Sequence, residues 1–176
     1  MPSADQPHPP DQPGRPVRLR PPEHRVQRRA VAWWTTRALL LAVPLLTALV
    51  VLCLLLADAR WWLVPLTAVA TAPAAVYVLV MPQWRYRVHR WETTEDAVYT
   101  SAGWLRQEWR VAPMSRIQTV DSVRGPLQRV FDLASVTVTT ASAAGPLTID
   151  GLDRATAAEV VQHLTATTQA TPGDAT

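Results

Sequence analysis

Two long uncharged stretches dominate the hydrophobic pattern of this chain of 176 residues. The first runs from Ala38 to Ala57 and the second from Trp61 to Met81. An α-helix rises about 1.5 Å per residue, so each stretch is long enough to cross the ~30 Å hydrocarbon core of a bilayer. Because only Asp58, Ala59 and Arg60 separate them, we predict a tight hairpin of two antiparallel transmembrane helices.

Aromatic and basic residues flank the two stretches in the pattern of a membrane protein. The ends of the stretches carry Trp33, Trp34, Trp61, Trp62 and Trp84, where an aromatic belt meets the lipid headgroups. Seven arginines precede the first stretch and Arg85, Arg87 and Arg90 follow the second, whereas the connecting loop has only Arg60 beside Asp58. The positive-inside rule therefore predicts a multi-pass protein of the cell membrane with both termini in the cytoplasm.

The segment before the first stretch divides into two parts. Residues 1–25 are rich in proline and poor in apolar residues, so we predict a disordered tail there, with a second tail at residues 168–176. Residues 26–37 are predicted to form an interfacial segment. Its apolar side chains would face lipid, and these are Val26, Ala30, Trp33 and Trp34.

A secretory signal peptide is the other interpretation of the first stretch, because Ala57-Asp58-Ala59 resembles a cleavage site. Cleavage would place the rest of the chain outside the cell. The apolar run is longer than the ~7–15 residues usual for a signal peptide, and a second apolar run follows at once. We therefore favour a membrane region over residues 26–83.

Beyond residue 83 the pattern changes to short alternations of polar and apolar residues, which are typical of half-buried strands. Strands are predicted at residues 85–89, 97–101, 104–111, 117–123, 135–140 and 147–149. In the third strand we expect Leu105, Trp109 and Val111 to share one face, after a turn or bulge at Ala102-Gly103.

Two helical segments complete the predicted domain. A helical turn is expected over residues 127–131, and Asp153 can cap a helix over residues 154–167. That helix would bury one apolar stripe, formed by Ala157, Val160, Val161 and Leu164. The result is a small α+β domain over residues 84–167, a curved antiparallel barrel or sheet that its C-terminal helix caps.

The order of motifs in this domain resembles that of YdbS-like bacterial membrane proteins with a bacterial pleckstrin-homology (PH) domain. The motifs are Tyr86-Arg87-Val88, Gly103-Trp104-Leu105, Pro113-Met114-Ser115-Arg116-Ile117-Gln118, Gly125-Pro126-Leu127-Gln128-Arg129 and Leu133-Ala134-Ser135-Val136. One departure is Asp132, where the family usually has glycine. Asp tolerates a left-handed backbone better than most residues, so we expect the turn to persist.

Charge and composition exclude several functional classes. Residues 84–165 contain nine arginines and nine acidic residues, so the domain offers no basic face for nucleic acid. The single cysteine, Cys53, lies in an apolar run and cannot form an internal disulfide. We find no metal, cofactor or catalytic pattern and predict that the protein is not an enzyme.

Arginines and one glutamine are the candidate contact residues for a partner or a lipid headgroup. The candidates are Arg85, Arg87, Arg90, Arg116, Gln118, Arg124 and Arg129. The first three cluster beside the membrane. Arg116 and Gln118 can alternatively bond the backbone of a neighbouring loop, and Arg124 and Arg129 can be ordinary solvated surface.

The resemblance implies a membrane-anchored interaction module. We expect the domain to assemble with another membrane protein that has PH-like domains, at the cytoplasmic face and as a homo- or hetero-oligomer. The alternative is binding of anionic lipid headgroups at the inner face of the membrane. The balanced charge of the domain argues against that alternative, because a headgroup site requires clustered cations.

Overall fold

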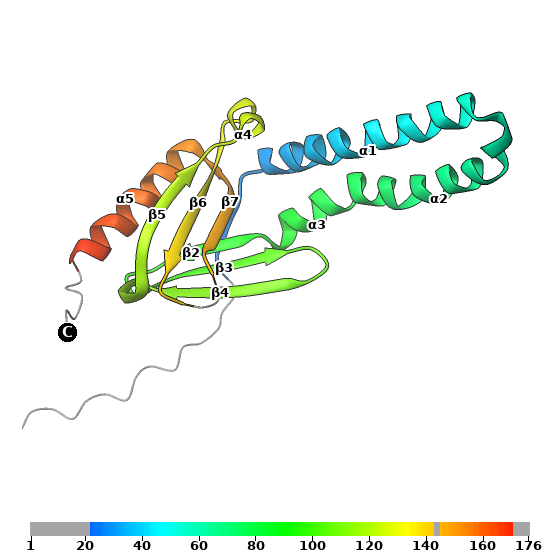
Figure 1. The fold of residues 1–176 in the computed structure, drawn as a ribbon. Helices are drawn as coiled ribbons and strands as arrows, with labels where there is room; N and C mark the ends of the chain where they lie inside the picture. Colours follow the sequence, from blue (N-terminus) through cyan, green and yellow to red (C-terminus); the bar gives the residue numbers. More distant parts are fainter. Residues whose placement is uncertain (1–21, 143–144, 171–176) are drawn as a thin grey trace, which may run out of the picture.

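A helical hairpin projects from a β-rich domain in the computed structural model, which describes residues 22–142 and 145–170 (Figure 1). The hairpin consists of α1 (Arg29–Leu55), a 3₁₀ turn (Ala57–Ala59) and α2 (Arg60–Leu79). A short helix, α3 (Met81–Val88), leads the chain back to the domain. The two predicted apolar helices are therefore confirmed, and α1 begins nine residues before its uncharged stretch.

The outer surface of the hairpin is apolar, and no other described residues cover it. Leu41 and Leu55 on α1 are 69% and 74% exposed, and Val69 on α2 is 71% exposed. Only a few side chains are buried between the helices, among them Ala42 and Leu63. Both helices are long and apolar enough to cross a membrane. An apolar surface of this extent is unfavourable in water and suits a lipid environment.

The first sheet contains four strands in the order β1-β2-β3-β4. They are β1 (His24–Arg25), β2 (Arg90–Thr93), β3 (Ala97–Gly103) and β4 (Gln107–Pro113), and each pair is antiparallel. Arg25 pairs with Arg90, although the whole hairpin separates them in sequence. The hairpin is thus an insertion between two neighbouring strands, and both of its ends are tied to the same sheet.

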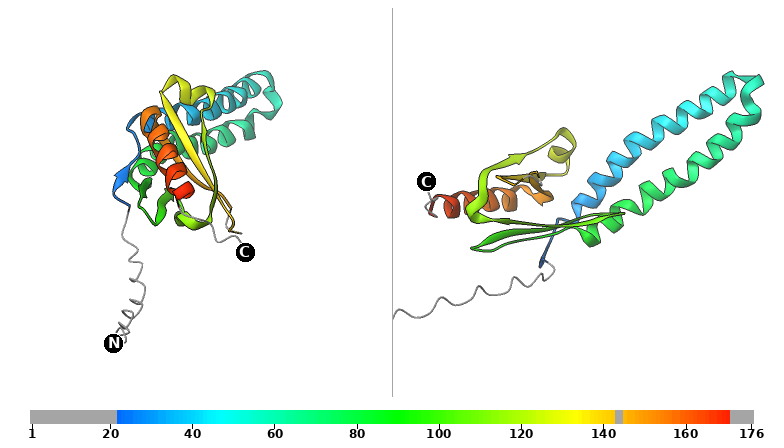
Figure 2. Two further views of the ribbon diagram at one scale, coloured as in Figure 1. Left: turned by 90° about the vertical axis from the view of Figure 1, so that its left-hand side faces the viewer. Right: turned by 60° about the horizontal axis from the view of Figure 1, so that its bottom comes forward.

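The second sheet has the order β5-β6-β7 and packs across the first. Its antiparallel strands are β5 (Ile117–Val123), β6 (Leu133–Thr140) and β7 (Leu147–Asp153). The short α4 (Pro126–Val130) connects β5 to β6, and α5 (Arg154–Ala170) lies against the second sheet (Figure 2). The predicted PH-like domain with a C-terminal cap is confirmed. On α5, Ala157, Val160 and Leu164 are buried, and Val161 is partly buried against the core.

The core of the domain includes residues that precede the first apolar stretch. Val26, Ala30, Trp33 and Trp34 join the core cluster with residues of both sheets. Gly151 on β7 permits this contact, because a Cβ atom there would lie 2.8 Å from the Cβ of Ala30. The prediction that these four side chains face lipid is therefore wrong. A one-dimensional pattern cannot distinguish an apolar face toward lipid from one toward a sheet distant in sequence.

Two of the predicted strands need correction. Residues 85–89 are mainly helical, and the strand begins only at Arg90. Five alternating residues are too few to exclude a helix, and here α3 continues the path of α2. The strand predicted over 104–111 begins at Gln107, so Leu105 does not share a strand face with Trp109. The turn lies at residues 104–106, after Gly103, whose φ of 121° favours glycine.

The predictions for the two tails are partly wrong, and the prediction for the turn at Asp132 is correct. The predicted tail at residues 1–25 is wrong at His24–Arg25, which form β1, while residues 1–21 lie outside the described residues. Helix α5 extends to Ala170, into the tail predicted at 168–176, and residues 171–176 also lie outside the description. The left-handed turn predicted at Asp132 is confirmed, with φ of 53°.

Candidate functional site

Trp34 organises the root of the hairpin, a name we use for Trp34, Arg85, His89 and Asp150. Its ring is buried where α1 emerges from the domain. The guanidinium carbon of Arg85 lies 4.7 Å from the centre of this ring, which is a cation–π geometry. The imidazole of His89 meets the same indole edge-on, with ring centres 5.2 Å apart. Helices α1 and α3 are thus joined at the point where they reach the domain.

A chain of hydrogen bonds extends from the root into the second sheet. Arg85 donates to Oδ2 of Asp150 over 3.1 Å, and the hydroxyl of Ser135 donates to Oδ1 of the same carboxylate over 2.7 Å. The amide nitrogen of Gln128 donates to Ser135 over 2.7 Å. The Gln128 carbonyl oxygen accepts the backbone N–H of Gly125 over 2.7 Å. Polar groups from α3, β7, β6 and α4 are therefore satisfied together.

The Nδ1 atom of His89, like the Nε1 atom of Trp34, is buried without a hydrogen-bond partner among the described residues. Burial, followed by the nearby positive charge of Arg85, lowers the pKa of His89 to about 4. The carboxylate of Asp150 opposes this shift. The imidazole is therefore neutral at physiological pH and acts as a packing group.

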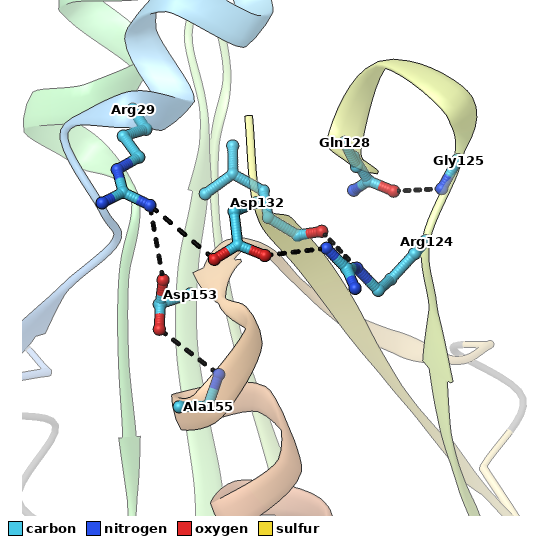
Figure 3. A network of polar contacts seen from close by, with 8 residues as sticks. Arg29, Arg124, Gly125, Gln128, Asp132, Asp153 and Ala155 are labelled. Atoms are coloured by element: carbon cyan, nitrogen blue, oxygen red, sulfur yellow. Dashed lines mark hydrogen bonds and ion pairs between the residues drawn. The ribbon is translucent and has the colours of Figure 1, made fainter. Parts of the chain in front are cut away.

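A second polar cluster ties the start of α1 to the turn between α4 and β6 (Figure 3). The carboxylate of Asp132 lies 3.0 Å from the guanidinium of Arg124 and 3.8 Å from that of Arg29. Arg29 also lies 3.9 Å from Asp153, which accepts the backbone N–H of Ala155 at the start of α5. Arg124 donates to the backbone carbonyl of Leu133 over 3.1 Å. Arg124 therefore has a structural role at this turn.

The exposed edge of the first sheet has a different character. Among the described residues β4 pairs only with β3, so the other edge of β4 is free. Trp109 and Val111 on this strand are 46% and 41% exposed. Arg110 donates to the carbonyl of Pro146 over 2.8 Å and holds β4 against the start of β7. An edge strand with exposed aromatic and branched side chains is a template for another extended segment.

Two pockets adjoin Trp109. One, of about 280 Å³, lies between β4 and the start of β7 and includes Val111, Arg116 and Leu147 in its lining. The other, of about 260 Å³, includes Arg87 and Arg90 in its lining. We call Trp109, Val111, Arg87, Arg90 and Arg116 the Trp109 surface. It combines apolar contact area with cations, a composition that is common at protein interfaces.

The seven predicted contact residues separate into three groups. Arg85 and Arg124 are engaged in internal contacts, as described above. Arg87, Arg90 and Arg116 lie around Trp109. Gln118 on β5 and Arg129 on α4 are exposed and line neither pocket beside Trp109.

Sequence reasoning missed the residues that hold the hairpin to the domain. Ser135, Asp150 and Trp34 were not singled out for this role, although Gln128 belongs to one of the motifs. One available signal was the acidic Asp150 between Ile149 and Gly151, directly after a segment predicted to be a strand and inside β7. Within the described part of the chain, no three His, Cys, Asp or Glu side chains gather as a metal site would require.

Comparison with known proteins agrees with this architecture. The sequence profile of the family described as Bacterial PH domain matches residues 36–168. The UPF0699 transmembrane protein YdbS of Bacillus subtilis (strain 168) is 26% identical over 124 residues, which cover 69% of this chain and 78% of that protein. No solved structure matches the chain. The profile match includes most of α1, all of α2 and α3, and both sheets except β1, so the chain belongs to the bacterial PH domain family and is a YdbS-like membrane protein.

Proposed function

We propose that this protein is a non-enzymatic, membrane-anchored interaction module whose PH-like domain assembles with another membrane protein at the cytoplasmic face. The observation that carries the proposal is the free edge of β4 with Trp109 and Val111 exposed on it. The partner we expect is a membrane protein with PH-like domains of its own. A second copy of this chain is the homo-oligomeric form of the same proposal.

The proposed orientation follows from the arginines at the domain end of the hairpin. Arg25 and Arg28 precede α1, Arg29 and Arg37 lie in its first three turns, and Arg85, Arg87 and Arg90 follow α2. The opposite end has Arg60, whose Nε donates to the carbonyl of Cys53 over 3.3 Å, and Asp58. Under the positive-inside rule the domain and both termini lie in the cytoplasm.

Strand addition is the binding mode that this edge favours. An extended segment beside β4 would satisfy the free backbone groups, and its apolar side chains would cover Trp109 and Val111. Arg87, Arg90 and Arg116 would favour acidic residues in that segment. Confinement of both proteins to one membrane raises their effective concentration, so even a weak strand contact can hold the complex together.

Co-purification from the native host tests this proposal. The full chain, tagged at its C-terminus, is extracted in mild detergent, with and without crosslinking, and proteins present in near-stoichiometric amount are identified. A membrane protein with PH-like domains should be recovered, and Trp109→Glu with Val111→Glu should remove it. Val130→Glu is the matched control, because Val130 is 77% exposed on α4, outside the Trp109 surface. Repeated absence of any partner, or its retention by the double variant, would contradict the proposal.

Anionic headgroup binding is the second candidate function. It is favoured by exposed Arg87 on α3, close to Arg90 and the predicted membrane boundary. Native mass spectrometry of the full chain should then find fewer bound anionic lipids after Arg87→Gln with Arg90→Gln than in the unmodified protein. Equal lipid counts would contradict this function. A fragment of residues 84–167 is unsuitable for the test because it lacks Trp34 and strand β1.

A further inference from the structure

The turn between β3 and β4, residues 104–106, reaches the membrane hairpin. The ring of Trp104 meets that of Tyr77 edge-on, with centres 6.2 Å apart. Tyr77 belongs to α2, near its domain end. In Figure 1 the β3–β4 hairpin extends along the same side of the molecule as α3 and the adjoining end of α2.

The position of Tyr77 along α2 places this contact at the edge of the bilayer. Tyr77 lies 17 residues after Arg60, the first residue of α2, a rise of about 25 Å from the far end of the hairpin. On α1, Ala38 lies 17 residues before Leu55 and is therefore at a similar height. Ala38 begins the first uncharged stretch of the sequence, so Trp104 lies where the hydrocarbon core gives way to headgroups.

The residues of the turn, 104–106, suit a position at the boundary between the hydrocarbon core and the headgroups. Leu105 is 83% exposed, the highest value among the exposed large apolar side chains of the described residues. Trp104 precedes it, and exposed Arg106 follows. An indole prefers the interface, a leucine prefers the acyl chains, and a guanidinium can reach the phosphates. In water most of the Leu105 side chain would be solvated and would contribute little to stability.

The backbone holds the turn in shape. Gly103 has φ of 121°, and a Cβ atom there would lie 1.8 Å from the carbonyl oxygen of Arg106. The chain can therefore close tightly over this glycine and present Leu105 at the tip. Residues 97–103 of β3 pair with residues 107–113 of β4 up to the turn, so the tip is supported by a regular hairpin.

We propose that Trp104, Leu105 and Arg106 form an interfacial anchor, with Leu105 inserted into the lipid leaflet nearest the domain. The ligand of this surface is the bilayer itself. The inference rests on the proposed membrane insertion of α1 and α2 and is independent of the proposed protein partner. A third attachment point, beside the two helices, restricts rotation of the domain and keeps β4 close to the membrane. We therefore expect the partner segment that adds to β4 to lie next to the membrane in the partner protein as well.

Site-specific labelling of the full chain tests the anchor. Leu105→Cys in a Cys53→Ser background carries an environment-sensitive fluorophore, and the protein is reconstituted in nanodiscs with or without spin-labelled lipids. Glu95→Cys is the matched control, because Glu95 is exposed in the turn at the other end of β3, about 20 Å from the tip. A label on native Cys53 in the otherwise unmodified chain reports insertion of α1.

The expected result is a shift of the Leu105 label to shorter emission wavelength and loss of most of its emission to lipids that carry the spin label near the headgroup. The Glu95 label should show neither change. Quenching at Cys53 with none at Leu105 would overturn the anchor and leave the membrane hairpin intact. Absence of quenching at both Cys53 and Leu105 would overturn the anchor together with the membrane insertion on which it rests.

Discussion

The root of the hairpin and the Trp109 surface use the same residue types for opposite purposes. At the root, Trp34 is 1% exposed, and Arg85 above it is paired with Asp150. At the Trp109 surface, Trp109 is 46% exposed, and Arg87 and Arg116 beside the pockets are solvent-exposed. Burial and pairing therefore decide whether such a residue has a structural or a recognition role. The residue type alone does not.

The largest expected effect separates the two tryptophans. Trp34→Ala removes a buried ring that packs against Arg85 and His89, so the domain should lose about 3–5 kcal/mol of unfolding free energy. Trp109→Ala should cost less than about 1 kcal/mol, because nearly half of that side chain is already solvated. Denaturant unfolding of the full chain in nanodiscs measures both values. Equal losses would show that the Trp109 surface is also part of the core.

Acidification should weaken the root through His89. Its pKa is about 4 in the folded protein and near 6.5 in an unfolded chain, so the unfolded state binds more protons between these values. The contribution of neutral His89 to the free energy of unfolding is therefore complete above pH 6.5. It is lost as the pH falls toward 4, and the total loss is roughly 3 kcal/mol.

Unfolding free energies measured from pH 7.5 to 4 check this prediction. His89→Phe cannot be protonated and should reduce the pH dependence by the contribution of His89. His163→Gln is the control, because His163 is exposed on α5 and should leave the dependence as it is in the unmodified protein. The role of His89 would be refuted by an unchanged pH profile in His89→Phe.

An ion pair at the root should contribute more to stability than one on strand β4. Arg85 and Asp150 are each 27% exposed and Asp150 also accepts from Ser135, so Asp150→Asn should cost about 2 kcal/mol. The pair of Arg110 with Glu108 on β4 is more exposed and 3.6 Å long, and Glu108→Gln should cost less than about 0.5 kcal/mol. The same unfolding measurement compares them. A larger loss for Glu108→Gln would contradict the expectation that the less exposed pair at the root stabilises the fold more.

The sequence was most informative where local patterns govern structure. The uncharged stretches, the alternation in residues 117–123 and the apolar stripe of α5 each predicted an element that the structure contains. These elements follow from periodicity or length. The turn at Asp132 was also predictable, because its backbone requirement is local.

The failures have a common physical cause, which is contact between residues far apart in the chain. Arg85 meets Asp150, which is 65 residues away, and Trp34 packs near Gly151 on β7. From sequence, Arg85, Arg87 and Arg90 were equivalent juxtamembrane cations. Only tertiary structure distinguishes Arg85, which is paired with Asp150, from Arg87 and Arg90, which line a pocket beside Trp109.

The smallest difference is expected between two variants of Asp132, which test whether backbone conformation or charge matters more at the turn. Its carboxylate reaches Arg124 and Arg29, but it is 53% exposed, so solvent screens both ion pairs. Asp132→Asn retains tolerance of the left-handed backbone and should cost about 0.5 kcal/mol. Asp132→Ala loses that tolerance as well, and the cost should rise to about 1.5 kcal/mol. If the two variants prove equally destabilised, the ion pairs contribute more than the backbone requirement of the φ of 53°.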